Sequence, residues 1–443
     1  MKKQQVSEIL SMGWPIAAEM ILIALLSNAN QYIWNSFSAD AVATIGSCNQ
    51  VFSLAANAYG IISVGGSILL APALGANRKR EIPQLIITLI MLTIGAGIFF
   101  GLLGLFCIPL CIRVLHIPAE LLQMTRQYLM VVLGLSVFQG MLTTLTAVFR
   151  SMGRMKLVMV NDVLVNLVTL LFNAGVLYLI PRNQQSMLLY AMNSIYAQLI
   201  GCLVLLFILH KEGYFDGQLN MSKIGKSCRA QLFRILRFGV PAGMEGIVYL
   251  IGQVIVVGFV GMLGKDAMIV RAYVLTVPTY MGVMVNVMTT ISYPMVGIAV
   301  GRGDPEKVVA TSHRMVHWSL AGTVVCCVIF GLISYPFLRL YTQDAGLLRM
   351  AMQLVGVKVV FYLGQSLAGP WMAVMKAVGE VKYVFWISVA GMAANLVVSY
   401  ILGIAAGFGL IGIWMGYLSD FAIKTVCCEI RFRKGAWKNL RIV

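Results

Sequence analysis

Twelve long, continuous apolar stretches dominate this sequence, and each is long enough to cross a lipid bilayer as a helix. A spanning helix needs about 20 mainly apolar residues for a hydrocarbon core of about 30 Å. A β-barrel strand would instead alternate in polarity over about ten residues. We therefore expect an all-α integral membrane protein with twelve transmembrane helices. The candidate spans lie near 9–33, 49–72, 84–112, 121–148, 157–180, 187–209, 235–262, 273–300, 315–340, 350–374, 383–406 and 410–429.

The amino-acid composition supports this class and excludes several others. Hydrophobic residues make up 60% of the chain and charged residues 11%, whereas soluble domains average about 45–50% and 25%. A soluble protein could not hide so much apolar surface from water. A disordered chain, a coiled coil and a nucleic-acid-binding domain are excluded on the same ground, despite a net charge of +17.

The positions of Lys and Arg predict the orientation of the spans. If the N-terminus is cytoplasmic, 25 of the 33 Lys and Arg fall on the cytoplasmic side and seven on the outer side. Short cytoplasmic segments of membrane proteins carry an excess of these residues. We therefore expect a multi-pass plasma-membrane protein with both termini in the cytoplasm, whose basic residues face an anionic lipid leaflet rather than nucleic acid.

Cysteine and histidine spacing gives no sign of a metal centre, a cofactor or an enzyme. The nine Cys show neither a disulfide framework nor zinc-site spacing. His313 and His317 lie one helical turn apart without a third ligand. Gly225-Lys226-Ser227 lacks the Gly that a phosphate-binding loop needs five residues earlier, where Asn220 stands. We expect no metal, no cofactor and no ATP-hydrolysing site.

The chain contains an internal repeat with a constant offset of 226 residues. Residues 9–19 align with 235–245, with Ile, Leu, Gly, Pro and Glu in common, and residues 147–156 align with 373–382. The same offset places Gly75 on Gly301. Six helices separate the copies, so both copies share one orientation in the membrane and are related by a pseudo-twofold axis along the membrane normal. We expect an N-terminal six-helix lobe (1–210), a cytoplasmic linker (211–234), a C-terminal six-helix lobe (235–429) and a basic cytoplasmic tail (430–443).

These repeated motifs resemble those of the multidrug and toxic compound extrusion (MATE) transporters. The resemblance rests on Trp14-Pro15-x-x-x-Glu19, Ala39-Asp40-Ala41-Val42-Ala43, Leu74-Gly75-Ala76-Asn77, Arg150-Ser151-Met152-Gly153 and Pro241-x-x-x-Glu245. It implies two six-helix lobes around a central cavity. It also implies a secondary active antiporter that exports small organic compounds, drug-like or metabolite, in exchange for H⁺ or Na⁺ by alternating access. The bilayer and a small organic substrate are the expected partners of a monomeric protein.

Three acidic residues within the spans are candidates for cation binding or protonation. Glu245 lies about ten residues into the seventh span, near the bilayer midplane at ~1.5 Å per residue. The resemblance implies that the acid of this Pro-x-x-x-Glu pattern is part of the cation site. Glu19 is its repeat mate at similar depth. Asp162 lies nearer the cytoplasmic edge, where a solvated carboxylate is the alternative interpretation. A buried acid that only ties neighbouring helices together is the alternative for Glu245 and Glu19.

Two prolines and two lysines accompany these acids. Pro15 and Pro241 each stand four residues before a candidate acid, so they are candidate hinges, with a simple packing kink as the alternative. Asp420 and Lys424 are one turn apart and are interpreted as a simple ion pair. Lys358 lies roughly 13 Å into the tenth span, which motivates the hypothesis that it pairs with Glu245.

Departures from the resembled pattern weaken the expectation of a strongly anionic cavity. Asn30 and Gln365 stand where the family often has Asp, and no acid follows Asn166, where Asn173 is a candidate substitute. These changes favour neutral, zwitterionic or anionic cargo. A lipid-linked oligosaccharide flippase is kept as an alternative function because its families share this general architecture, although it would call for a markedly cationic cavity, for which Lys358 alone is too little. The remaining expected residues of a substrate cavity, together with Lys358, are Tyr249, Tyr273, Tyr280 and Met284.

Overall fold

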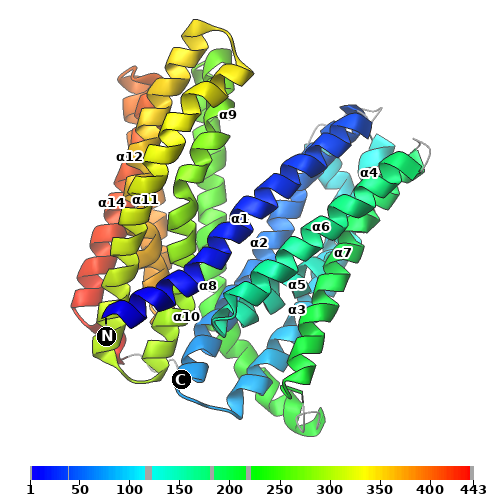
Figure 1. Ribbon diagram of the computed structural model, residues 1–443, viewed down its shortest axis with the longest axis vertical. Coiled ribbons are helices and arrows are strands. Elements are labelled where there is room, and N and C mark those ends of the chain that lie inside the picture. Colours follow the sequence, from blue (N-terminus) through cyan, green and yellow to red (C-terminus); the bar gives the residue numbers. More distant parts are fainter. Residues whose placement is uncertain (1, 38, 115–121, 180–183, 216–220, 440–443) are drawn as a thin grey trace. The chain divides into compact units, whose positions relative to one another are not determined.

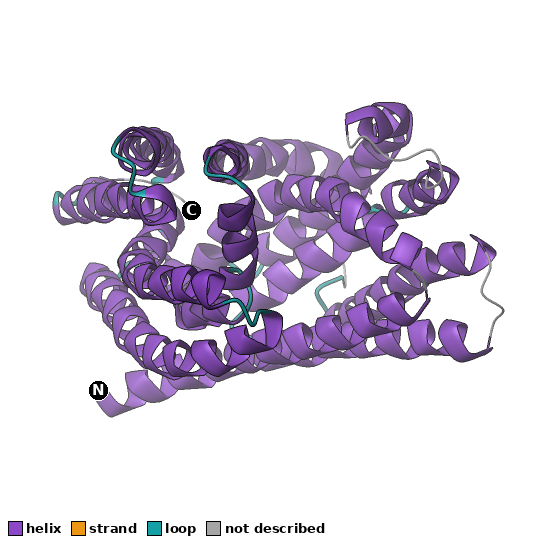
Figure 2. Cartoon of the chain, turned by 90° about the horizontal axis from the view of Figure 1, so that it is seen from above, coloured by secondary structure: helices purple, strands orange, loops and turns teal. Residues whose placement is uncertain are grey.

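The computed structural model describes residues 2–37, 39–114, 122–179, 184–215 and 221–439, and within these ranges every regular element is a helix (Figure 2). The helices of the first half are α1 (Lys2–Phe37), α2 (Ala39–Gly75), α3 (Glu81–Val114), α4 (Leu122–Gly134), α5 (Val137–Ser151), α6 (Met155–Leu179) and α7 (Gln184–Lys211). The second half contains α8 (Met221–Met262), α9 (Lys265–Val274), α10 (Val283–Gly301), α11 (Pro305–Tyr341), α12 (Ala345–Ala377), α13 (Val381–Tyr400) and α14 (Gly409–Arg433). Three short helical turns are η2 (Val277–Gly282), η3 (Ile401–Ala405) and η4 (Ala436–Asn439).

The number of helices that can cross a membrane agrees with the sequence. Eleven stretches of the described helices are long and apolar enough to span a bilayer, and α4 with α5, bent by 44°, can make a twelfth. The bend lies at Leu135–Ser136, where the Ser136 hydroxyl hydrogen bonds at 2.9 Å to the hydroxyl of Tyr59. The eighth span is expected near 273–300 and corresponds to the stretch Pro278–Gly301, which consists of the turn η2 and α10, whereas α9 ends before it at Val274.

The described chain divides into two compact units. Unit 1 contains residues 1–70 and 78–240, and unit 2 contains residues 71–77 and 241–443. Pro241, inside α8, is the first residue of the longer part of unit 2. Residues 221–234, which the sequence assigns to a linker, form the beginning of α8. Residues 1, 216–220 and 440–443 lie outside the described residues, and the lobe boundaries given above stay a prediction.

Each unit has its own helix packing (Figure 1). In unit 1, α1 packs along α6, α3 packs on α4 and α5, and α7 contacts α4, α5 and α6. In unit 2, α12 is the central helix and contacts α9, α10, α11, α13 and α14. The largest apolar cluster of unit 2 joins these helices through Phe361 and Tyr362 of α12 with Trp414 and Tyr417 of α14. The side chains of α12 that point into this cluster, such as Phe361 and Tyr362, are therefore buried within the unit.

The turns that end the helices repeat with the offset seen in the sequence. Gly153 and Gly379 are 226 residues apart, and both adopt a left-handed backbone, with φ of 76° and 89°. After each of these glycines, the next backbone N–H bonds to the carbonyl of Phe149 or Met375, five residues earlier. This cap ends α5 and α12 at a fixed place because glycine enters the left-handed region without strain. The basic residues of the last turns, Arg150 and Lys376, are thereby held in equivalent positions.

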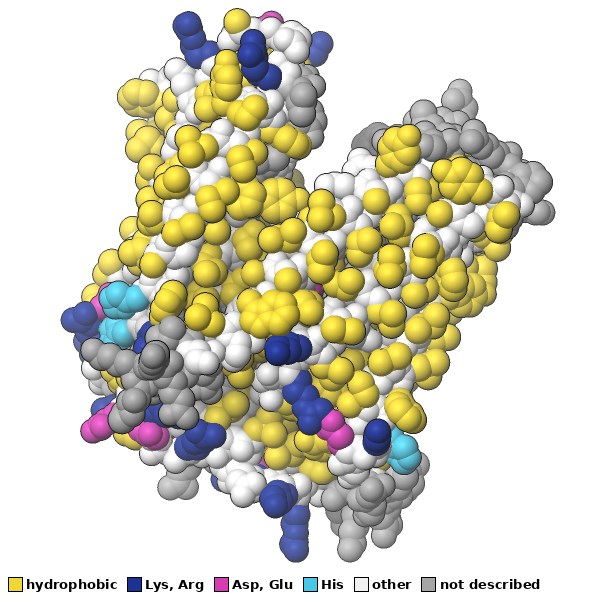
Figure 3. Space-filling model, in the orientation of Figure 1, with side chains coloured by type: hydrophobic (Ala, Val, Ile, Leu, Met, Phe, Trp, Pro, Cys, Tyr) yellow, Lys and Arg dark blue, Asp and Glu magenta, His cyan; other side chains and the backbone are white. Residues whose placement is uncertain are grey.

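The surface has the polarity expected of a membrane protein. On the face shown in Figure 3, hydrophobic side chains cover the flanks of the helices, and Lys and Arg gather toward helix ends. Large exposed apolar side chains include Phe106, Tyr178, Val254 and Leu332. Exposed side chains of this size are unfavourable in water and favourable in lipid, which agrees with the expected environment.

Candidate functional site in unit 2

Unit 2 contains a partly open cavity of about 270 Å³ between α8, α10, α12, α13 and α14. Apolar walls come from residues such as Val248, Phe361, Met372, Met392 and Phe421. The cavity's polar and charged lining consists of Glu245, Tyr249, Thr289, Tyr293, Gln365, Lys376, Ser388, Asp420 and Lys424. An apolar pocket with a few convergent polar groups is the usual form of a small-molecule site.

Glu245 forms its ion pair with Lys376, which enters the cavity from the last turn of α12. The two side chains retain 20% and 12% of their exposure, so the pair borders the cavity rather than being sealed in the core. The hydroxyl of Tyr293, from α10, lies within hydrogen-bonding reach of the same ammonium group. Within the part of the chain that the structure describes, Lys376 is thus the one cationic partner of this carboxylate.

A second ion pair lines the cavity on α14. Lys424 Nζ donates to Asp420 Oδ2 at 2.8 Å, one turn away on the same helix. This confirms the interpretation of the two residues as an i,i+4 pair. With Glu245 and Lys376, the cavity has two carboxylates and two ammonium groups, so its formal charge is balanced.

Besides Glu245 Oε2, which forms the ion pair with Lys376, two buried oxygens of the cavity have no hydrogen-bond partner among the described residues. They are Asp420 Oδ1 and the hydroxyl of Ser388. Asp420 Oδ1 lies against Gly391, where an added Cβ would approach it to 2.2 Å. Unpaired buried polar atoms are unfavourable by about 1–3 kcal/mol each. Their position in a cavity indicates groups that a bound molecule would satisfy.

Unit 1 repeats the first ion pair but surrounds it differently. Arg150, 226 residues before Lys376, donates from Nη2 to Glu19 Oε1 at 2.5 Å. The same nitrogen lies 3.6 Å from Asp162 Oδ2. Two acids therefore share one arginine in unit 1. The residue equivalent to Asp162 in unit 2 is Ser388.

Comparison with known proteins places the chain in a family. The family model described as MatE matches residues 15–179 and again residues 241–401, so its two matches begin at the two prolines of the repeat. The chain belongs to the MatE family. Its members are transporters rather than enzymes, and the expectation drawn from the sequence motifs is confirmed.

Individual relatives cover almost the whole MatE chain. The "Uncharacterized transporter YisQ" of Bacillus subtilis is 23% identical over 437 residues, 97% of this chain and 94% of the relative. The "Probable multidrug resistance protein NorM" of Thermotoga maritima is 21% identical over 452 residues, 98% and 94% of the two chains. A solved MATE transporter of Vibrio cholerae is 15% identical, with a TM-score of 0.87 and 99% of each chain covered, and it shares the fold.

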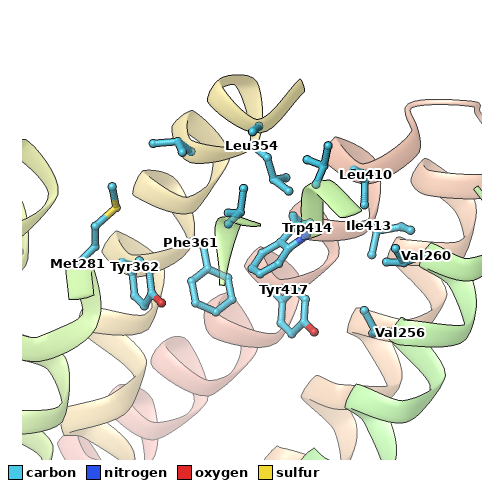
Figure 4. Packing of buried hydrophobic residues seen from close by; sticks show 14 of the residues in the cluster. Val256, Val260, Met281, Leu354, Phe361, Tyr362, Leu410, Ile413, Trp414 and Tyr417 are labelled. Atoms are coloured by element: carbon cyan, nitrogen blue, oxygen red, sulfur yellow. The ribbon is translucent and has the colours of Figure 1, made fainter. Parts of the chain in front are cut away.

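The hypothesis of an ion pair between Lys358 and Glu245 is wrong for this MatE chain, because Glu245 contacts Lys376 instead. Lys358 is only 2% exposed, and its ammonium lies 4.1 Å from the ring centre of Trp414, 5.1 Å from Phe361 and 5.2 Å from Tyr362. These rings lie side by side in Figure 4. No acidic residue of the described chain pairs with Lys358, so cation–π contacts are its main stabilisation.

The asparagines of unit 1 form a chain of hydrogen bonds. Asn173 Nδ2 donates to Asn30 Oδ1 at 2.8 Å, and Asn193 Nδ2 donates to Asn173 Oδ1 at 3.0 Å. This network links α1, α6 and α7 and contains no ionisable group. Asn166 stands apart, since its amide bonds to the backbone carbonyl of Asp162 at 2.8 Å. A substrate role for these residues stays a prediction.

The remaining expected cavity residues divide into two groups. Tyr249 and Gln365 line the unit 2 cavity with Glu245. Three others do not line it. Tyr280 packs against Phe330 with ring centres 5.7 Å apart, Tyr273 packs against the main apolar cluster, and Met284 lies where a Cβ on Gly322 would meet it. Helices α1 and α8 continue through Pro15 and Pro241, and a hinge at either residue stays a prediction.

Sequence reasoning missed Lys376 as the partner of Glu245, and it missed Tyr293 and Ser388 as cavity residues. A signal for Lys376 existed in the repeat, because residues 147–156 align with 373–382 and place Arg150 on Lys376. An acid and a base that recur 131 residues apart in both halves suggest a conserved spatial relation between the copies. Among the described residues, no group of three or more His, Cys, Asp or Glu side chains is placed to hold a metal ion.

Proposed function

We propose that this MatE transporter is a secondary active antiporter that exports small organic compounds, drug-like or metabolite, in exchange for H⁺ or Na⁺ by alternating access. Family membership supports transport, and the Thermotoga relative is named a probable multidrug resistance protein. The distribution of Lys and Arg supports a plasma-membrane protein with both termini in the cytoplasm. We propose that it acts as a monomer.

The observation that carries this proposal is the ion pair between Glu245 and Lys376 at the edge of the cavity. Placing a charged carboxylate within the membrane is unfavourable by several kcal/mol, and such groups usually belong to an ion or substrate path. Lys376 keeps Glu245 compensated while no coupling ion is bound. A proton or Na⁺ that reaches Glu245 must replace this internal partner.

Binding of the coupling ion changes the charge of the cavity. Before binding, Glu245 and Asp420 balance Lys376 and Lys424. After Glu245 is neutralised, the ammonium of Lys376 remains without its carboxylate and the cavity carries one net positive charge. That charge disfavours any cargo held through a cationic group. Two ligands that oppose each other at one site couple their movements without ATP.

The same cavity gives the expected contacts of the cargo. Asp420 Oδ1 and Ser388 Oγ are buried and have no hydrogen-bond partner among the described residues. A cargo that donates hydrogen bonds to them therefore binds more tightly, because it removes the unfavourable free energy of these unpaired groups. Phe361, Phe421 and Met372 supply an apolar wall. We expect compact, hydrogen-bond-donating compounds with an apolar ring to bind there.

Purified protein in proteoliposomes tests the function. A fluorescent organic cation and a fluorescent zwitterion are followed by stopped-flow fluorescence while an H⁺ gradient or a Na⁺ gradient is imposed separately. We expect efflux of at least one cargo with one gradient, and none after the gradient is collapsed with an ionophore. Gradient-independent translocation of a fluorescent lipid-linked sugar, without cargo efflux, would instead establish a flippase. The balanced charge of the cavity does not favour that outcome.

A further inference from the structure

Glu19 and Asp162 form an arrangement in unit 1 that the exchange at Glu245 does not use. Both acids lie beside Arg150, at 2.5 Å and 3.6 Å from the same guanidinium nitrogen. The side chain of Glu19 retains 7% of its exposure and that of Asp162 retains 15%. One arginine compensates one carboxylate, so the cluster has one negative charge too many if both acids are ionised.

Nearby charged groups do not supply the missing positive charge. Lys156 lies over the ring of Trp14 at 5.6 Å, and Arg154 pairs with Glu212. The other described side chains that contact Asp162 are neutral: the amide of Asn161 from α6 and the hydroxyl of Thr146 from α5, each 3.5 Å from Asp162 Oδ1. An uncompensated buried carboxylate is unfavourable by several kcal/mol in rough terms.

Unsatisfied atoms around the two acids point to a bound ligand. Glu19 Oε2 is buried and accepts no hydrogen bond. The side-chain oxygen Oδ1 of Asn161, a residue only 2% exposed, is also buried without a partner. The side-chain nitrogen Nδ2 of the same residue donates to Asp162 Oδ1. The carboxyl groups of Glu19 and Asp162 lie close together, because both contact the same nitrogen of Arg150. Two neighbouring carboxyl groups can hydrogen bond to each other only if one of them carries a proton.

We propose that Glu19 and Asp162 share one proton and form a second proton-binding site, in unit 1, separate from Glu245. A proton suits this site better than Na⁺ because the guanidinium group of Arg150 already lies against both acids and repels a second cation. A proton bound to a carboxyl oxygen removes the excess charge without needing space or further ligands. The shared proton leaves one carboxylate for Arg150.

The repeat provides an internal comparison. In unit 2 the equivalent positions are Glu245, Lys376 and Ser388, one acid to one base, so no additional proton is needed there. Unit 1 has Arg150 in place of Lys376, which keeps the charge of the base, and Asp162 in place of Ser388, which adds an acid. We therefore assign one more bound proton to unit 1 than to unit 2.

Infrared difference spectroscopy of the purified protein between neutral and alkaline pH tests the site without any cargo. We expect the C=O stretch of a protonated carboxyl group in the wild type, its loss in Glu19→Gln and in Asp162→Asn, and its persistence in Glu245→Gln. Asp162→Ser, which copies unit 2, serves if the other variants fold poorly, and it too should lose the band. Ser388→Asp should add a second band.

Three results would overturn the proposal: no such band in the wild type, a band that survives in both unit 1 variants, or a band that sodium chloride removes. The role of this proton in transport rests on the proposed function and is measured separately, as one proton fewer exchanged per cargo in Asp162→Asn proteoliposomes. If gradient-driven efflux fails while the band behaves as expected, the antiport function is wrong and the proton site remains.

Discussion

Arg150 and Lys376 occupy equivalent positions in the two halves of the repeat, and each forms an ion pair with the acid 131 residues before it. A left-handed glycine three residues later ends the helix in both cases. The duplication therefore preserves an acid–base contact between two helices as well as the fold. The base changes from Arg to Lys without a change of charge, whereas the third residue changes from the acid Asp162 in unit 1 to the neutral Ser388 in unit 2.

Lys376→Met should destabilise the protein by about 2–4 kcal/mol, because it leaves the carboxylate of Glu245 without a cationic partner in a largely buried place. The double variant Glu245→Gln with Lys376→Met should recover most of that loss, since it removes both charges. Thermal unfolding in detergent measures both effects. Additive losses in the double variant would show that the two side chains do not interact.

Gly391→Ala should lower the stability by about 1–3 kcal/mol and weaken cargo binding, because the new methyl group would lie 2.2 Å from Asp420 Oδ1 and displace that carboxylate. Gly356→Ala is the matched control on α12, where no atom lies within 4 Å of an added Cβ. Equilibrium binding of the fluorescent cargo and thermal unfolding check both variants. Equal behaviour of the two alanines would contradict the position given to Asp420.

Lys358→Met should leave the pH profile of transport unchanged, because Lys358 has no contact with Glu245 and packs among the rings of Trp414, Phe361 and Tyr362. Methionine fills a similar volume and removes a buried charge, so we expect equal or slightly higher stability. Initial rates of efflux across a pH series provide the measurement. A displaced profile would revive the link between Lys358 and the coupling site.

Asn173→Ala should destabilise unit 1 by about 2 kcal/mol, because it leaves the amides of Asn30 and Asn193 without their shared partner. Asn166→Ala should have a smaller effect, of about 0.5 kcal/mol, since its amide bonds only to a carbonyl of its own helix. Chemical or thermal unfolding of the two variants provides the comparison. A larger loss in Asn166→Ala would contradict the hydrogen-bonded chain.

The spans and the repeat could be predicted from the sequence because hydropathy and a fixed offset are properties of the chain alone. The partner of Glu245 could not be predicted from depth. Helix α12 has 33 residues, about 50 Å, which exceeds the bilayer core. Counting inward from an apolar edge therefore placed Lys358 level with Glu245. Lys376 is five turns further along the same helix and is the residue that reaches it.

The start of the eighth span shows a second limit of sequence reasoning. Pro278 is visible in the sequence, but spanning helices tolerate proline, so the sequence alone does not show that α9 ends at Val274 and that the span begins at Pro278. Likewise, the aromatic ring of Tyr280 and the flexible thioether of Met284 are of kinds that often line a binding cavity. Their contacts with Phe330 and Gly322 turn them away from it.

Gradient-driven efflux from proteoliposomes containing Glu245→Gln tests the central claim most directly. Glu429→Gln is the matched control, because Glu429 pairs with Arg433 and does not line the cavity. We predict a loss of roughly tenfold or more in the gradient-dependent rate for Glu245→Gln and a rate like that of the wild type for Glu429→Gln. Full gradient-dependent efflux by folded Glu245→Gln would contradict the account.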